Sequence, residues 1–225
     1  MAGNIAKRPF AGLLFDMDGV LVDSEACIAE AAVRMFRQLY GVSVSEAEFA
    51  PFVGMGENKY LGGVALAHGV EIDLERAKEL TYRLYGEIIP EKLKEVRGAK
   101  ALVRACRRRG VRTALASSAD RVKVDANLNA LGLSEADFDA VLTGLDVERK
   151  KPFPDIYLEA ARRIGLDPRE CLVVEDAIAG IEAGRSAGAT CAGISTSLPA
   201  ERLLAAGAQR VFADLEELTP FVLGG

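Results

Sequence analysis

Short apolar runs alternate with longer amphipathic stretches along most of the chain. The runs lie at residues 12–15, 113–116, 140–142, 171–174 and 190–194, and polar or turn residues bound them. Runs of this length are typical of strands that are buried on both faces of a parallel sheet. The stretches between them repeat apolar residues at helical spacing, as in residues 156–164. This alternation predicts right-handed βαβ units and a doubly wound α/β sheet.

The alternation stops between about residues 24 and 96, where helical patterns at 29–39 and 74–85 occur without a convincing strand. A mostly helical block of this length is large enough to form a small domain. We therefore expect an α/β core made of residues 1–23 and 94–225. A helical cap domain of residues 24–93 is expected to be inserted after the first strand.

Polar side chains stand at the ends of the predicted strands. The first strand ends at Asp16, the second at Ser117 and the fourth at Glu175 and Asp176, while Lys151 follows the weaker third strand across a short loop. Ligands of open α/β sheets bind at the carboxyl ends of the strands. We therefore expect these side chains to converge in one crevice.

Two carboxylates with i, i+2 spacing, Asp16 and Asp18, directly follow the first strand. In an extended continuation both side chains point to the same face, and a divalent cation would relieve their repulsion. Oxygen ligands of this kind favour Mg²⁺, and Gly19 permits a sharp turn away from the site. Taken alone, the motif would fit a turn with two solvated acids equally well.

Four ordered motifs carry a family resemblance. Residues 15–25 (FDMDGVLVDSE), Ser117, Lys151 in KPFPD, and Glu175–Asp176 in VVEDAIAGIEAG resemble the motifs of the haloacid dehalogenase superfamily. Within it they resemble the β-phosphoglucomutase and phosphatase branch, which carries a helical cap. The segments ASSADRVKVDANL and APFVGMGENKYLGGVA are also similar to the dehalogenase-like segment of a plant chloroplast protein.

The resemblance implies a role for each catalytic position. Asp16 would be the nucleophile that forms an aspartyl-phosphate, and Asp18 would be the general acid and later the general base. Ser117 would donate a hydrogen bond to the phosphoryl group, and Lys151 would place positive charge against it. Alternatives remain, because Ser117 could merely cap the following helix and Lys150 competes with Lys151 for the motif position.

The resemblance also implies a Mg²⁺ cofactor. Asp16, the backbone carbonyl of Asp18, and Asp176 would hold the ion, with Glu175 supporting this shell or binding directly. A bland interpretation of Glu175 and Asp176 is an acid pair at a helix N-terminus.

The implied function is hydrolysis of a small phosphorylated metabolite. A true haloacid dehalogenase lacks a second aspartate two residues after the nucleophile, so Asp18 favours phosphoryl chemistry. The enzymatic alternative is a phosphomutase, and the alternative of another class is a regulatory binding module that retained the fold. β-Phosphoglucomutases carry a histidine where this chain has Ile28. Their cap arginine corresponds to Glu57 or to Lys59, depending on the glycine from which the position is counted.

Substrate contacts are expected from two segments. The GMGENKYLGG stretch is interpreted as a loop over the active site that sets specificity through Gly54, Glu57, Asn58 and Lys59. Beyond the second strand, Ser118 and Arg121 are further candidates, with Lys123 near them. A solvated helix face is an equally good interpretation of Arg121 and Lys123.

The composition of the chain indicates which binding partners and which cellular compartment to expect. A net charge of −5 argues against nucleic-acid binding, which needs an excess of Lys and Arg. No apolar stretch approaches 18 residues, and the N-terminal MAGNIAKRPF lacks the apolar core of a signal peptide. The four cysteines are widely spaced, so a reducing compartment is expected. We expect a monomer in the cytoplasm, or in the chloroplast stroma if a transit peptide has been removed.

Overall fold

The structure is a computed structural model that describes residues 10–224. The start of the predicted core and most of the MAGNIAKRPF stretch lie outside the described residues. Six parallel strands form the main sheet in the order β5-β4-β1-β6-β7-β8. Their bounds are β1 Gly12–Phe15, β4 Arg112–Ala116, β5 Ala140–Leu142, β6 Cys171–Glu175, β7 Thr190–Ile194 and β8 Arg210–Phe212. The predicted doubly wound α/β sheet is thus confirmed.

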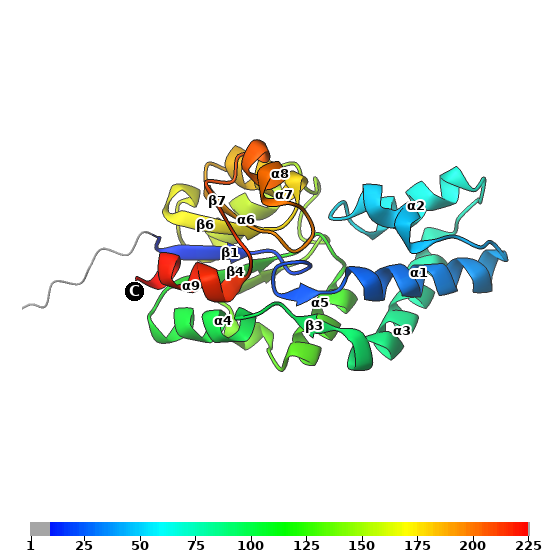
Figure 1. The fold of residues 1–225 in the computed structure, drawn as a ribbon, viewed down its shortest axis with the longest axis horizontal. Coiled ribbons are helices and arrows are strands. Elements are labelled where there is room, and N and C mark those ends of the chain that lie inside the picture. Colours follow the sequence, from blue (N-terminus) through cyan, green and yellow to red (C-terminus); the bar gives the residue numbers. More distant parts are fainter. Residues whose placement is uncertain (1–9, 225) are drawn as a thin grey trace, which may run out of the picture.

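Helices cover both faces of this sheet (Figure 1). On one face lie α4 (Ala99–Arg108), α5 (Arg121–Leu131) and α9 (Leu215–Leu223), and on the other α6 (Asp155–Arg163), α7 (Ile178–Ser186) and α8 (Ala200–Ala206). Successive strand residues supply the two hydrophobic cores, since Leu13 and Phe15 pack on the first face and Leu14 on the second. Both faces of β1 are therefore buried, which explains its continuous apolar run. Short 3-10 turns, η2 (Glu135–Asp137) and η3 (Pro168–Glu170), precede β5 and β6.

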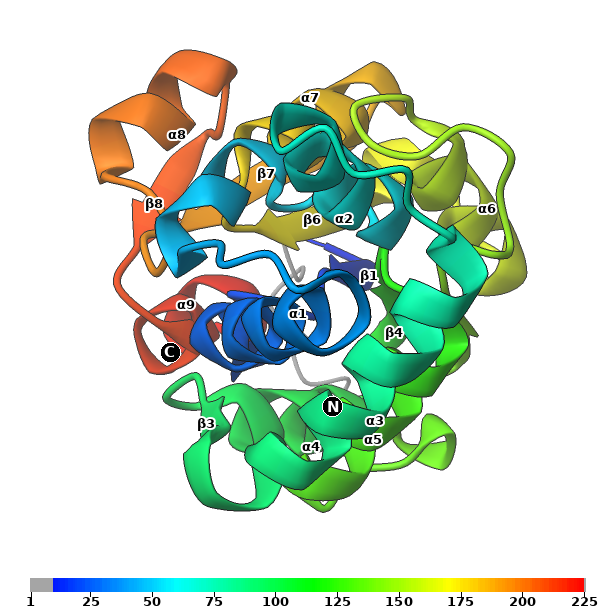
Figure 2. The same cartoon turned by 90° about the vertical axis from the view of Figure 1, so that its right-hand side faces the viewer.

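The helices between residues 25 and 92 form a helical unit beyond the carboxyl ends of the main-sheet strands (Figures 1 and 2). It contains α1 (Glu25–Tyr40), the 3-10 helix η1 (Glu46–Phe52), α2 (Glu57–Ala67) and α3 (Leu74–Lys92). A hydrophobic core separate from those of the sheet holds the unit together, with Met35, Phe36, Leu61 and Tyr85 among its most buried members.

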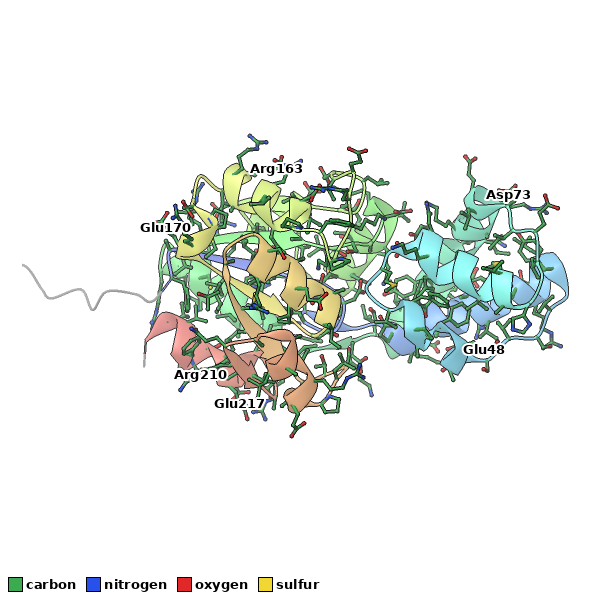
Figure 3. All side chains as sticks on the ribbon, turned by 90° about the horizontal axis from the view of Figure 1, so that it is seen from above. Glu48, Asp73, Arg163, Glu170, Arg210 and Glu217 are labelled. Carbon is green, nitrogen blue, oxygen red and sulfur yellow. The ribbon has the colours of Figure 1, made fainter. Side chains whose placement is uncertain are left out.

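The helical unit joins the α/β part through two strands that pair with each other. These are β2 (Val22–Asp23) and β3 (Lys94–Glu95), which are antiparallel, with Val22 opposite Glu95 and Asp23 opposite Lys94. Seen from above, Glu48 and Asp73 mark the helical unit, whereas Arg163, Glu170, Arg210 and Glu217 mark the α/β part at the other end (Figure 3).

One local prediction is wrong. The GMGENKYLGG stretch is a loop only up to Gly56, because α2 begins at Glu57 and includes the last two glycines. A Cβ atom on Gly63 would lie 2.2 Å from the Phe52 ring, so this glycine lets η1 pack closely on α2. Within the described part of the chain, no helix combines the length and apolar character needed to cross a membrane.

Candidate active site

The predicted catalytic residues meet where the strand order reverses. The chain moves outward from β1 to β4 and β5, then returns to place β6 directly beside β1. Ligands of doubly wound sheets bind at such a reversal. Asp16 follows β1 and Glu175 ends β6, and the amide of Asp16 donates a hydrogen bond of 3.0 Å to the Val174 carbonyl. The two carboxylates are thereby held side by side.

Lys151 links these acids. Its ammonium donates to Asp16 Oδ1 at 2.5 Å, to Glu175 Oε1 at 2.6 Å and to the Ala116 carbonyl at 3.1 Å. Burial lowers the pKa of Lys151, but Asp16 and Glu175 outweigh burial and hold that pKa above its usual range. Tyr157 also donates to Glu175 Oε1, at 2.6 Å. Lys151 therefore stays charged, and its position is set by three acceptors.

The Asp16 carboxyl group lies in a buried and acidic environment, which Lys151 alone does not offset. Burial raises its pKa to about 7, with Glu175 and Asp18 adding to the rise and Lys151 opposing it. Burial and the neighbours Glu175 and Asp16 also raise the pKa of Asp176. A further positive charge beside these carboxylates would lower both pKa values and stabilise the ionised acids.

The carboxylates of Asp16, Glu175 and Asp176 form an acidic trio whose oxygens lie within 4.8 Å of one another. All three side chains are buried, and hard oxygen donors of this kind suit Mg²⁺. Two glycines allow this approach. A Cβ atom on Gly19 would lie 1.9 Å from Asp176 Oδ2, and one on Gly180 would lie 1.8 Å from Glu175 Oε1. The residues present therefore fit a divalent cation.

Asp18 has a different environment from Asp16. Its Oδ1 accepts hydrogen bonds from Ser24 Oγ and from Asn127 Nδ2 at 3.3 Å, and it lies 2.9 Å from the ammonium of Lys123. Lys123 is buried on α5. Burial lowers the pKa of Lys123, but Asp18 and other nearby acidic groups outweigh burial and hold that pKa above its usual range. The side chain of Asp18 is not a member of the acidic trio.

Ser117 and Ser118 follow β4 at the rim of the site. Ser117 Oγ accepts a hydrogen bond of 3.1 Å from the Ala119 amide, and Lys150 Nζ donates to the Ser118 carbonyl at 3.2 Å. The buried Ser118 Oγ has no hydrogen-bond partner within residues 10–224. Lys150 thus holds the backbone here, while Lys151 reaches the acids.

A narrow cleft of about 50 Å³ connects these groups to the helical unit. Its lining includes the predicted residues Asp16, Asp18, Gly54, Glu57, Ser117, Ser118, Lys151, Glu175 and Asp176. Two lining residues that we did not predict are Glu25 and Tyr60, which face the cleft from α1 and α2. Glu25 stands inside the first motif, so its place there was the available signal, whereas Tyr60 is indistinguishable in sequence from a core residue of a helix.

Three predicted substrate contacts lie elsewhere. Asn58 and Lys59 are exposed and do not line the cleft, because α2 turns their side chains away from the buried Glu57 and Tyr60. Arg121 donates to Asp125 at 3.0 and 3.2 Å and also contacts Glu135. Arg121 thus lines neither the cleft nor the larger groove beside it, whereas Lys123 is buried and lines the cleft.

Comparison with known proteins confirms the family resemblance. Residues 10–188 match the family model of haloacid dehalogenase-like hydrolases. The chain is 42% identical over 212 residues to "Protein SUPPRESSOR OF QUENCHING 1, chloroplastic" of Arabidopsis thaliana, covering 93% of this chain but 20% of that protein. It is 32% identical to the "Phosphorylated carbohydrates phosphatase" of Thermotoga maritima, covering 78% of this chain and 81% of that one.

A solved structure shares the fold over nearly the whole chain. The putative β-phosphoglucomutase of Thermotoga maritima superposes with a TM-score of 0.72 at 30% identity, covering 94% of this chain and 96% of that chain.

Proposed function

The chain belongs to the haloacid dehalogenase-like hydrolases, and from this premise we propose that it is a phosphatase for small phosphorylated metabolites that acts through an aspartyl-phosphate. The observation that carries the proposal is the pairing of Asp16 with Lys151 at the reversal of the strand order. Asp18, two residues after Asp16, has different hydrogen-bond partners. Covalent catalysis by a carboxylate divides a difficult displacement into two easier steps.

In the first step, a carboxylate oxygen of Asp16 attacks phosphorus while the bond from phosphorus to the substrate oxygen breaks. The leaving oxygen takes its proton from Asp18, so the products are the aspartyl-phosphate and the free alcohol. Lys151, held between Asp16 and Glu175 at 2.5 and 2.6 Å, neutralises charge on the phosphoryl oxygens. Ser117 positions the same group, since its hydroxyl lies at the end of β4 beside the cleft.

In the second step, Asp18 accepts a proton from water, and the resulting hydroxide attacks phosphorus. The bond from phosphorus to Asp16 breaks, which releases inorganic phosphate and restores the Asp16 carboxylate. Lys123 and Asn127 hold Asp18 through its Oδ1. Because both contacts engage Oδ1, we assign proton transfer to the other carboxylate oxygen, Oδ2.

The acidic trio is the site that we assign to Mg²⁺, with the Asp18 carbonyl as the expected backbone ligand. Glu175 is further committed to Lys151 and Tyr157, so we assign it chiefly to orienting the shell. When bound, the ion supplies charge neutralisation for the phosphoryl group.

We assign the helical unit the role of a cap. Excluding water protects an aspartyl-phosphate and strengthens the electrostatic contacts around it. Support for this role comes from Glu25, Glu57 and Tyr60, which reach the same cleft as Asp16. The reducing compartment that we propose, cytoplasm or chloroplast stroma, agrees with the burial of all four cysteines.

Hydrolysis is favoured over mutase chemistry by two positions. Ile28 lines the cleft and cannot hydrogen-bond a sugar hydroxyl, and Lys59, the candidate anchor for a second phosphate, does not line it. To separate the two reactions, β-glucose 1-phosphate with a trace of the 1,6-bisphosphate would be supplied, and glucose 6-phosphate and free phosphate followed together. Fast isomerisation without release of phosphate would contradict a hydrolase.

The proposal as a whole is tested with p-nitrophenyl phosphate. We expect Mg²⁺-dependent release of p-nitrophenol, and we expect Asp16→Asn to reduce it by at least about a thousandfold because the nucleophile is lost. Quenched wild-type enzyme should carry one hydroxylamine-sensitive phosphoryl group on the peptide that contains Asp16. A variant that keeps more than about a tenth of the wild-type rate would contradict covalent catalysis by Asp16.

A further inference from the structure

The wall of the cleft contributed by the helical unit holds buried oxygens without partners. Glu57 and Tyr60 are each 6% exposed, and the Tyr60 hydroxyl and Glu57 Oε2 have no hydrogen bond of normal geometry among the described residues. Ser118 Oγ is in the same state on the α/β side of the cleft. The Tyr82 hydroxyl, which is also unpaired and lies outside the cleft, interacts with the Glu57 carboxyl group. Buried polar atoms are nearly always paired in native proteins. The atoms of Glu57, Tyr60 and Ser118 line a cleft, so a ligand is their natural partner.

The unpartnered atoms define what the ligand must offer. In its ionised form a glutamate carboxylate can only accept hydrogen bonds, whereas the hydroxyls of tyrosine and serine can donate and accept. A ligand group that satisfies Glu57 Oε2 therefore has to donate, which hydroxyl and amino groups do.

This wall is also short of positive charge. The two lysines that line the cleft belong to the α/β part and are already paired, Lys151 with Asp16 and Glu175 and Lys123 with Asp18. Burial raises the pKa of Glu57, and of Glu25 to about 7, despite the opposing effect of Lys123. Glu25 therefore carries its full negative charge only above about pH 7. A second anionic group of a substrate would be desolvated here beside acids, without a free counter-charge.

Beside the cleft lies a groove of about 890 Å³ between the helical unit and the α/β part. Glu25, Val53 and Tyr60 are among the residues that line both spaces, so the two spaces lie side by side. Apart from the residues of the acidic trio, the groove is also lined by the acids Asp23, Glu46 and Glu182 and by one cation, Arg202. A volume of this order accommodates a small organic ligand, and its excess of acids disfavours an anionic one.

We propose that the natural substrate is a phosphomonoester whose leaving group donates hydrogen bonds through hydroxyl or amino groups and bears no second anionic group. The inference rests on the proposed phosphatase function and deepens it. Glu57 and Tyr60 select the donors, and the surrounding carboxylates repel phosphate or carboxylate at the far end of the substrate.

Matched substrates test this proposal on the wild-type enzyme in excess free Mg²⁺. Glucose 6-phosphate and glucosamine 6-phosphate carry no second anion, 6-phosphogluconate carries a carboxylate, and fructose 1,6-bisphosphate carries a second phosphate. We expect kcat/KM for the first two to exceed that for the last two by about tenfold or more, because unfavourable charge placement weakens binding strongly. A kcat/KM for 6-phosphogluconate or the bisphosphate equal to that for glucose 6-phosphate would overturn the proposal.

The Glu57→Gln variant tests whether the Glu57 carboxylate causes the preference for substrates without a second anionic group. Removing this carboxylate should reduce the preference for glucose 6-phosphate over 6-phosphogluconate by about threefold or more. Glu71→Gln is the matched control, since Glu71 is an exposed acid of the helical unit and lines neither space. An unchanged ratio in a folded Glu57→Gln enzyme would contradict the role of Glu57.

The Tyr60→Phe variant and the substrate p-nitrophenyl phosphate provide a second, independent test. If Glu57→Gln does not fold, Tyr60→Phe removes only the hydroxyl and should lower kcat/KM for glucose 6-phosphate more than for p-nitrophenyl phosphate. Equal losses would contradict the assignment of Tyr60. Turnover of p-nitrophenyl phosphate without discrimination among the sugars refutes the substrate class alone. No turnover of any ester refutes the phosphatase function itself.

Discussion

Asp16 and Asp18 stand two residues apart but have contrasting surroundings. Asp16 lies among buried acids and faces Lys151, while Asp18 accepts hydrogen bonds from Ser24 and Asn127. Different environments are the means by which two like groups take different roles in one site. The assignment of nucleophile and proton donor therefore follows from partners supplied by distant parts of the chain.

Replacing Asp18 should reveal its role through the leaving group. We expect Asp18→Asn to reduce kcat for sugar phosphates by about 10²–10⁴-fold, because their alkoxide leaves only with a proton. The loss in the phosphorylation step should be much smaller for p-nitrophenyl phosphate, whose leaving group needs no proton. Single-turnover release of p-nitrophenol and of the sugar measures this difference. Equal losses for both esters would contradict proton transfer by Asp18.

Residues at strand ends were predictable, whereas partners from other elements were not. The motif positions could be read because a strand places its next side chain at a known edge of the sheet. Lys123 and Asn127 come from the buried face of α5, where their spacing looks the same as that of any helix. Their contacts with Asp18 depend on how α5 packs, and a single sequence does not contain that information.

At the scale of elements, apolar burial overrides local signals. The predicted helix at residues 74–85 extends to Lys92 as α3, although Gly86 and Pro90 are poor helix formers. Ile88 and Ile89 are buried in the core of the helical unit, and their packing supports the last turns. The edge strand β8 went unpredicted because it has three residues and only partial burial.

Two glycines in different elements should respond oppositely to alanine. Gly98 has φ of 87°, and a Cβ there would lie 2.5 Å from the Glu216 amide nitrogen, which joins α4 closely to α9. Gly86 lies exposed within α3 with nothing near its position. We expect Gly98→Ala to lower the free energy of unfolding by about 2–4 kcal/mol. We expect Gly86→Ala to raise it by about 0.5–1 kcal/mol.

Urea unfolding of the two variants beside the wild type measures both changes. A Gly98→Ala protein as stable as the wild type would contradict the close approach of α4 to α9. The Gly86 variant controls for a general effect of added methyl groups.

At the scale of the whole molecule, metal binding should appear as stability. A ligand present at about 100 times its Kd adds about 2.7 kcal/mol. For a chain of this size we therefore expect Mg²⁺ to raise Tm by several degrees relative to EDTA. In Asp176→Asn the response should largely disappear. Without metal this variant should be at least as stable as the wild type, because one of three crowded carboxylates is neutral. An undiminished response in Asp176→Asn would contradict the acidic trio as the site.

The pairing of β2 with β3 has a consequence for how this protein can evolve. The chain leaves the α/β part at Asp23 and returns at Lys94, and these two residues are direct antiparallel partners. Residues that face each other in this way can be joined by a two-residue hairpin turn. Everything between them is therefore a cassette whose two chain connections lie side by side, and recombination could exchange it without disturbing the register of any strand in the main sheet. The contacts of α3 with the α5 region, such as Lys78 with Asp120 and Tyr85 with Asn127, would have to be matched by the new cassette. Chemistry and selectivity can diverge separately in such a lineage, and a graft of a foreign cassette between Asp23 and Lys94 is the corresponding route for redesign.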